Sequence, residues 1–116
     1  MRTDKDFRIG RHLEGRTLAA ALTVLEFLRE ERSGSESEIT GGGCQAFYRP
    51  EEWRVRGEAY GLKSVLILCH DGGDLGPYCD YAQSCGGSAE RFSEWMAKDG
   101  FYVEQCTGWY SAVYNL

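Results

Sequence analysis

The segment "SVLILC", residues 64–69, decides how this sequence folds. It is a continuous apolar run between two polar segments. A strand that is buried on both faces has this pattern, because covering both faces removes the usual alternation of apolar and polar side chains. We therefore predict a central strand over these residues, with Cys69 as a small buried side chain at its end.

Two segments away from this strand have helical periodicity. In "RTLAAALTVLEFLREER", residues 16–32, leucines recur at the spacing that forms one stripe of a helix. These leucines are Leu18, Leu22, Leu25 and Leu28. In "SAERFSEWMAKDG" we predict a helix over residues 88–99 with Ser88 as N-cap and Gly100 as its stop. Its predicted buried row is Ala89, Phe92 and Met96.

Other segments predict further strands. "ITGGGCQAFYRP" predicts a strand that begins near Cys44, and "EEWRVRGEAYG" is compatible with a strand or with a short helix started by Pro50. The last segment, "FYVEQCTGWYSAVYNL", residues 101–116, predicts a hairpin that turns at Thr107 and Gly108.

That two-residue turn fixes which side chains share a face of the sheet. One face would contain Phe101, Val103, Tyr110, Ala112 and Tyr114, and we assign it to the core because it is the more apolar. The other would contain Tyr102, Glu104, Cys106, Trp109, Ser111 and Val113. Trp109 and Tyr102 would then lie near solvent beside Glu104.

The hydrophobic period changes from 3.6 to 2 residues between these segments, which is typical of an α+β protein. The chain of 116 residues, 42% of them hydrophobic, has the size and composition of one globular domain. We predict a single domain over residues 1–116, with a mainly antiparallel sheet and two helices packed on it.

Composition also narrows the setting and the partners. We expect a cytoplasmic protein, because no apolar run approaches the roughly 20 residues that span a bilayer and the first ten residues are charged. Residues 1–56 contain 10 Lys/Arg and 10 Asp/Glu, whereas residues 57–116 contain 3 and 8. The net charge of −5 therefore lies in the second half, which disfavours direct nucleic-acid binding there and favours a basic partner.

The stretch "CHDGGDLGPYCDYAQSC", residues 69–85, contains the residue types of metal and catalytic sites. Its cysteines form no C-x2-C pair, so we predict no metal site and no cofactor. Five cysteines without an export signal predict free thiols. A cysteine nucleophile at Cys44 with His70 as its base remains an alternative, although no local signature connects the two residues.

Three segments, "ITGGGCQA", "CHDGGDLGPYCDY" and "YVEQCTGWYSAVY", resemble small proteins of bacteriophages, prophages and plasmids. The resemblance covers about residues 64–116 and implies a mobile-element setting and a host-cell cytoplasm. In general character the chain is similar to anti-CRISPR proteins, because it is short, acidic and rich in aromatic residues.

These observations lead to one functional hypothesis and two alternatives. The first is a non-enzymatic inhibitor that binds a basic surface of a host nucleic-acid-targeting defence complex or its nuclease. The alternatives are a small enzyme that uses Cys44 and His70, and a metal-dependent accessory domain. For the inhibitor, we predict no catalytic residue and a partner-binding surface of carboxylates and aromatic anchors. The predicted surface residues are Asp71, Asp74, Tyr78, Tyr102, Glu104 and Trp109.

Overall fold

A computed structural model describes residues 13, 15–31, 46–70 and 74–116 of the chain. Within these residues four strands form one antiparallel sheet in the order β1-β2-β4-β3. The strands are β1 (Phe47–Tyr48), β2 (Leu66–Cys69), β3 (Phe101–Gln105) and β4 (Tyr110–Asn115). The helices are α2 (Gly15–Glu31), α3 (Pro50–Arg56), α4 (Gly76–Cys79) and α5 (Ser88–Lys98). The α+β class predicted from the sequence is therefore confirmed.

Strand β2 is the buried centre of the sheet, as its apolar run predicts. It pairs with β1 on one side and with β4 on the other, and all four of its residues are buried. Its side chains alternate between the two faces, so that Leu66 and Leu68 belong to one core cluster and Ile67 and Cys69 to a second.

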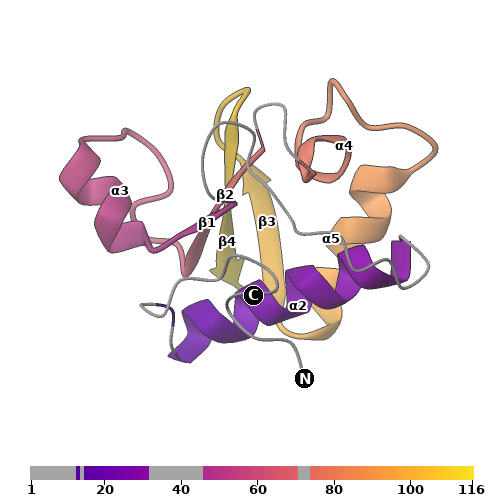
Figure 1. The fold of residues 1–116 in the computed structure, drawn as a ribbon, viewed down its shortest axis with the longest axis horizontal. Helices are drawn as coiled ribbons and strands as arrows, with labels where there is room; N and C mark the ends of the chain where they lie inside the picture. Colours follow the sequence, from indigo (N-terminus) through magenta and orange to yellow (C-terminus); the bar gives the residue numbers. More distant parts are fainter. Residues whose placement is uncertain (1–12, 14, 32–45, 71–73) are drawn as a thin grey trace.

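Helices α2 and α5 cover one face of the sheet, and α3 covers part of the other (Figure 1). The larger core cluster lies under α2 and α5. The predicted helix over residues 16–32 is confirmed as α2, but the buried stripe of α2 is rotated from the predicted leucine row. Leu25 and Leu28 are buried, whereas Leu18 and Leu22 are half-buried because the helix places Ala21, Val24 and Phe27 against the core instead.

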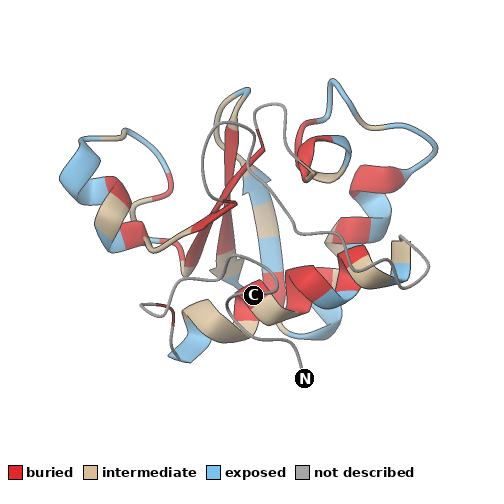
Figure 2. Cartoon of the chain, in the orientation of Figure 1, coloured by how far each residue is buried: buried red, intermediate tan, exposed pale blue. Residues whose placement is uncertain are grey.

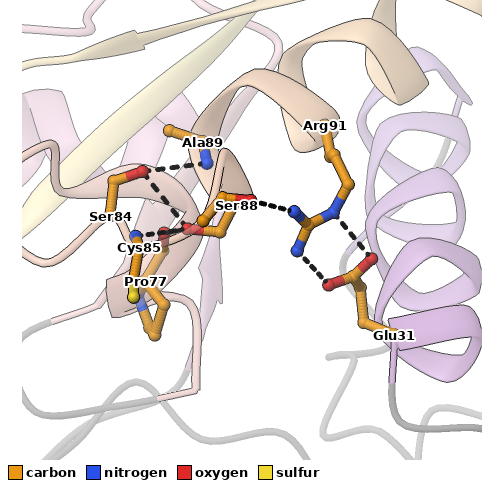
Figure 3. Close-up of polar contacts among 8 residues, drawn as sticks. Glu31, Pro77, Ser84, Cys85, Ser88, Ala89 and Arg91 are labelled. Carbon is orange, nitrogen blue, oxygen red and sulfur yellow. Dashed lines mark hydrogen bonds and ion pairs between the residues drawn. The ribbon is translucent and has the colours of Figure 1, made fainter.

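Helix α5 begins one residue earlier than the predicted N-cap at Ser88 implies. Gly87 is the N-cap, at φ 77°, and Ser88 is the first helical residue. The Ser88 hydroxyl donates to the Pro77 carbonyl at 2.6 Å and accepts from the Cys85 N–H at 3.0 Å, while the Ser84 hydroxyl accepts from the Ala89 N–H (Figure 3). The capping acceptor therefore comes from the preceding loop. The predicted buried row of α5 and its stop at Gly100, at φ 84°, are confirmed.

An ion pair joins the end of α2 to α5. The Arg91 guanidinium donates to both carboxylate oxygens of Glu31, at 2.8 and 3.2 Å, and to the Gly86 carbonyl at 2.6 Å (Figure 3). Arg91 lowers the pKa of Glu31, mainly through the hydrogen bonds.

No helix in the described ranges is long and apolar enough to cross a membrane.

The segment after Pro50 forms a helix rather than a strand. Pro50 occupies the first turn of α3, where its missing N–H costs no hydrogen bond, and Gly57 ends the helix at φ 82°. The Glu52 carboxylate accepts the Arg49 N–H at 2.9 Å. The helix places Trp53, which is fully buried, on the second face of the sheet. The predicted start of a strand near Cys44 falls outside the described residues, and β1 (Phe47–Tyr48) lies in the later part of the same predicted segment.

The C-terminal hairpin forms, but its predicted register is wrong. Val103 pairs with Val113, and the N–H groups of Cys106 and Thr107 both donate to the Tyr110 carbonyl at 3.1 Å. The loop between the strands is one residue longer than the predicted two-residue turn. Because side chains alternate along a strand, this shift of one residue turns β4 over relative to β3.

The two faces of the hairpin therefore differ from the prediction. The face toward α2 and α5 contains Phe101, Val103, Gln105, Ser111 and Val113. The opposite face contains Tyr102, Glu104, Tyr110, Ala112 and Tyr114. The predicted core set is thus divided between two cores, because this sheet buries side chains on both faces.

Candidate partner-binding surface

Strand β3 lies at one edge of the sheet and is its most exposed strand. Its residues alternate between the core side and solvent: Phe101 is buried, Tyr102 and Glu104 are exposed, and Val103 and Gln105 are half-buried (Figure 2). In the described part of the chain, β3 pairs only with β4. No described segment pairs with its outer edge, so among these residues the edge is open to a further strand.

The hydrogen bonds of the hairpin show which backbone groups face this open edge. The Cys106 N–H donates to the Tyr110 carbonyl, so the backbone N–H and C=O groups of the even-numbered residues point toward β4. The odd-numbered residues of β3 point their N–H and C=O groups away from β4. These residues are Phe101, Val103 and Gln105. No backbone hydrogen bond from another described segment reaches Val103.

A groove of about 560 Å³ runs along this edge, and we call it the β3 groove. It is lined by Tyr81, Tyr102, Val103, Glu104, Gln105, Cys106 and Thr107. Tyr81 comes from the loop after α4, and its N–H donates to the Gln105 side-chain oxygen at 3.1 Å. The Tyr81 and Tyr102 side chains are 64% and 44% exposed, so two aromatic rings are available to a partner at this groove.

The sheet face beside the groove has an aromatic pair and a carboxylate. The rings of Tyr102 and Tyr114, which are paired across β3 and β4, stack at 5.0 Å between centroids and 17° between planes. This contact holds the exposed Tyr102 ring in place. Desolvation raises the pKa of Tyr114. Glu104 is exposed on the same face, and the lining of the β3 groove contains no lysine or arginine. The surface is therefore aromatic and negatively charged.

Asp80 connects the Tyr81 loop to β3. Its carboxylate accepts hydrogen bonds from the Ala82 N–H at 3.0 Å, from the Gln83 side chain at 3.0 Å and from the Gln105 side chain at 3.1 Å. These bonds lower the pKa of Asp80, the one from Gln83 contributing most. The Ala82 and Gln83 donors lie in the same loop as Asp80, whereas the Gln105 side chain connects this loop, and with it Tyr81, to the end of β3.

We expect Asp80→Asn to destabilise the protein at pH 7, because an amide replaces one acceptor oxygen by a donor that faces donor groups. The folded-state pKa of Asp80 is the lower one, so its stabilising contribution is present above the unfolded pKa of about 3.9 and disappears as the pH falls through the folded value. Urea denaturation at pH 7 and pH 3 measures this effect. The difference between variant and wild type should shrink in acid, and a difference independent of pH would contradict the assignment.

The structure brings together only part of the predicted binding set. Tyr102 and Glu104 lie on one face at the β3 edge, as described. Trp109 lies in the hairpin loop and is half-buried against Trp53. Tyr78 lies on the other side of the sheet, where its ring contacts Phe27 at 5.1 Å. Asp74 is half-buried in the turn before α4, and Asp71 falls outside the described residues.

His70 is an interior residue. Its side chain is fully buried, and its Nε2 lies 3.0 Å from the hydroxyl of buried Ser111, which also contacts the Cys79 carbonyl at 3.4 Å. This bond connects the end of β2 to β4. Cys44, the other member of the predicted catalytic pair, falls outside the described residues. Within the ranges that the structure describes, no three His, Cys, Asp or Glu side chains are grouped as metal ligands.

The four described cysteines are free, and their environments predict different reactivities. Cys85 is exposed, while Cys69 and Cys79 are buried. Burial and the nearby Glu104 raise the pKa of Cys106 to about 11, and burial raises that of Cys79. The thiolate is the reactive form, so the Cys106 thiol should react slowly at neutral pH.

We therefore expect a thiol reagent at pH 7.5 to modify Cys85 first among the four described cysteines of the folded protein, and Cys69 and Cys79 only after unfolding. Peptide mapping of partly labelled protein measures this order. All five thiols of the chain should react in denaturant without a reducing agent. A smaller total, or early labelling of Cys79, would contradict the prediction.

Three residues of this surface were not predicted from the sequence. Tyr81 follows Asp80 in a polar segment with no periodicity, and Gln105 and Tyr114 owe their places to the hairpin register. The only local signal for Tyr81 is a large aromatic residue between polar ones, which also occurs in core residues. Only the contact between this loop and β3 places it at the groove.

The described residues form an α+β fold in which the edge strand β3 presents the exposed side chains of Tyr102 and Glu104. Comparison of the chain with protein-family models, with curated proteins and with solved structures found no match in any of the three.

Proposed function

We propose that this protein is a non-enzymatic inhibitor that binds a basic surface of a host nucleic-acid-targeting defence complex. The observation that carries this proposal is the β3 side of the sheet. Two exposed tyrosine rings flank a groove whose charged side chain is Glu104 and whose lining contains no cation. Aromatic rings supply contact area at interfaces, and carboxylates pair with Lys or Arg.

The charge distribution of the chain supports the same class of partner. The second half, which contains β3 and β4, has 8 acidic and 3 basic residues. Its long-range field attracts a basic surface and repels nucleic acid, so the protein would compete with phosphate for the surface that it covers. The specificity would come from desolvated contacts at the groove, since charge alone attracts any basic protein and is screened by salt.

The test is phage restriction in bacteria that contain a defined CRISPR–Cas system. Across a panel of such systems, expression of the wild-type chain should restore plaque formation by a targeted phage for at least one system. Tyr102→Ala and Glu104→Lys should abolish this effect and weaken binding to the isolated complex by about 30-fold or more, the scale of an interface hot spot.

Matched changes on other faces provide the controls. Tyr60→Ala removes an exposed tyrosine beyond α3, and Glu26→Lys reverses an exposed charge on α2. Both variants should inhibit like the wild type. Inhibition that is lost equally in the control variants, or that survives both Tyr102→Ala and Glu104→Lys, would exclude this surface. Absence of inhibition across the panel would overturn the proposed target.

A further inference from the structure

The open edge of β3 presents backbone groups in the arrangement that a pairing strand requires. Val103 lies at its middle and points its N–H and C=O outward, between the outward groups of Phe101 and Gln105. The β3 groove runs beside these groups along residues 102–107. A groove that follows an edge strand has the shape of an extended peptide rather than that of a compact ligand.

We propose that the partner enters this groove as an extended, basic segment that adds a fifth strand to the sheet at β3. The inference rests on the proposed function in one respect, because it takes the β3 side as the binding surface. It adds the mode of binding and the chemistry of the segment. Both strands of an antiparallel pair rise by about 3.4 Å per residue, so the five residues of β3 would pair with a segment of about the same number of residues.

The side chains beside the edge determine the chemistry of the added strand. Side chains on neighbouring strands that share a face interact in cross-strand pairs. On the sheet face that contains Tyr102 and Glu104, side chains of the added strand would contact these two residues. Glu104 favours a lysine or arginine there through ion pairing, and Tyr102 favours one through cation–π contact. Val103 on the other face favours small apolar side chains. Alternating basic and apolar residues therefore fit the edge best.

Electrostatics also separates this occupant from a second copy of the chain. Two copies each have a net charge of −5 and would bring their acidic halves together at this edge. A basic segment instead relieves the charge of Glu104. The edge is thus protected from self-pairing and open to a cationic strand, a known use of charged residues at sheet edges.

The probe for this proposal is a six-residue peptide of alternating lysine and valine, blocked at both ends, with the matching glutamate–valine peptide as its control. Titration of the ¹⁵N-labelled full chain should move the amide signals of β3 and of Tyr81. The glutamate peptide should bind at least about tenfold more weakly, and Glu104→Lys should reverse this preference.

A backbone change separates strand addition from side-chain docking. Ligation at Cys85 allows a synthetic segment of residues 85–116 with N-methylvaline at position 103, which removes the outward N–H but retains the side chain. Binding of the lysine peptide should fall at least about tenfold relative to the unmethylated ligated chain. The β3–β4 hydrogen bonds do not use this N–H, so the fold should remain.

Unchanged affinity after methylation, signal changes on another surface, or no saturable binding of the lysine peptide would overturn strand addition. Dimerisation through β3 without peptide would also overturn it, because a second copy would then occupy the edge. Phage protection that needs Tyr102 and Glu104 but survives Val103→Pro would retain the proposed function and remove strand addition. Specific binding of the lysine peptide without inhibition of any CRISPR–Cas system would retain strand addition and remove the proposed function.

Discussion

Replacing Trp53 with alanine should lower the free energy of unfolding by about 3–5 kcal/mol, the usual cost of truncating a fully buried large aromatic residue. Trp53 is fully buried on the second face of the sheet. Its ring lies 5.2 Å from that of Tyr110 and 4.9 Å from that of Tyr48, and the Arg56 guanidinium lies 4.8 Å from its centroid. Trp53 is the α3 residue in the second core cluster, where it packs with side chains of β2 and β4, so its loss leaves a cavity that partial relaxation does not fill.

Urea denaturation followed by circular dichroism measures this effect. Val55→Ala is the matched control, because Val55 lies on the same helix and is 90% exposed. It should change stability by less than about 0.5 kcal/mol, as surface substitutions usually do. A loss below about 1 kcal/mol for Trp53→Ala would show that the second core contributes little to folding.

Replacing Leu25 with alanine should cost about 2–5 kcal/mol, the range for a leucine truncated in a packed core. Leu25 is 2% exposed and belongs to the larger core cluster under α2. Surrounding side chains come from α5 and the sheet as well as from α2, so local relaxation will fill the space only in part.

The neighbouring Glu26 is exposed and provides the control at the next position of the same helix. Glu26→Ala retains helix propensity and should leave the unfolding midpoint nearly unchanged. If Leu25→Ala leaves the midpoint as unchanged as Glu26→Ala does, then α2 does not pack on the sheet as described.

Elements whose signals are local could be predicted from the amino-acid sequence. The apolar run before Cys69 identified the central strand, because a strand buried on both faces has no polar alternation. The period of 3.6 residues identified α2 and α5, and Gly100 identified the end of α5, since a left-handed residue there favours glycine. For the candidate site, the sequence identified Tyr102 and Glu104 as neighbours on one strand, with the acidic charge in the same half of the chain.

The way in which these elements combine could not be predicted, because it depends on tertiary packing. Because the hairpin loop has one residue more than predicted, β4 presents the opposite side chains to each face. Tyr110 and Ala112 therefore pack with Trp53 in the second core cluster rather than with Phe101 and Val103. The sequence contains no independent mark of this register, because both faces of β4 are apolar enough to be buried. The edge position of β3 and the approach of Tyr81 depend on contacts between segments far apart in sequence. Pairing order and face are therefore set by packing on both sides of the sheet, which local hydrophobic patterns do not specify.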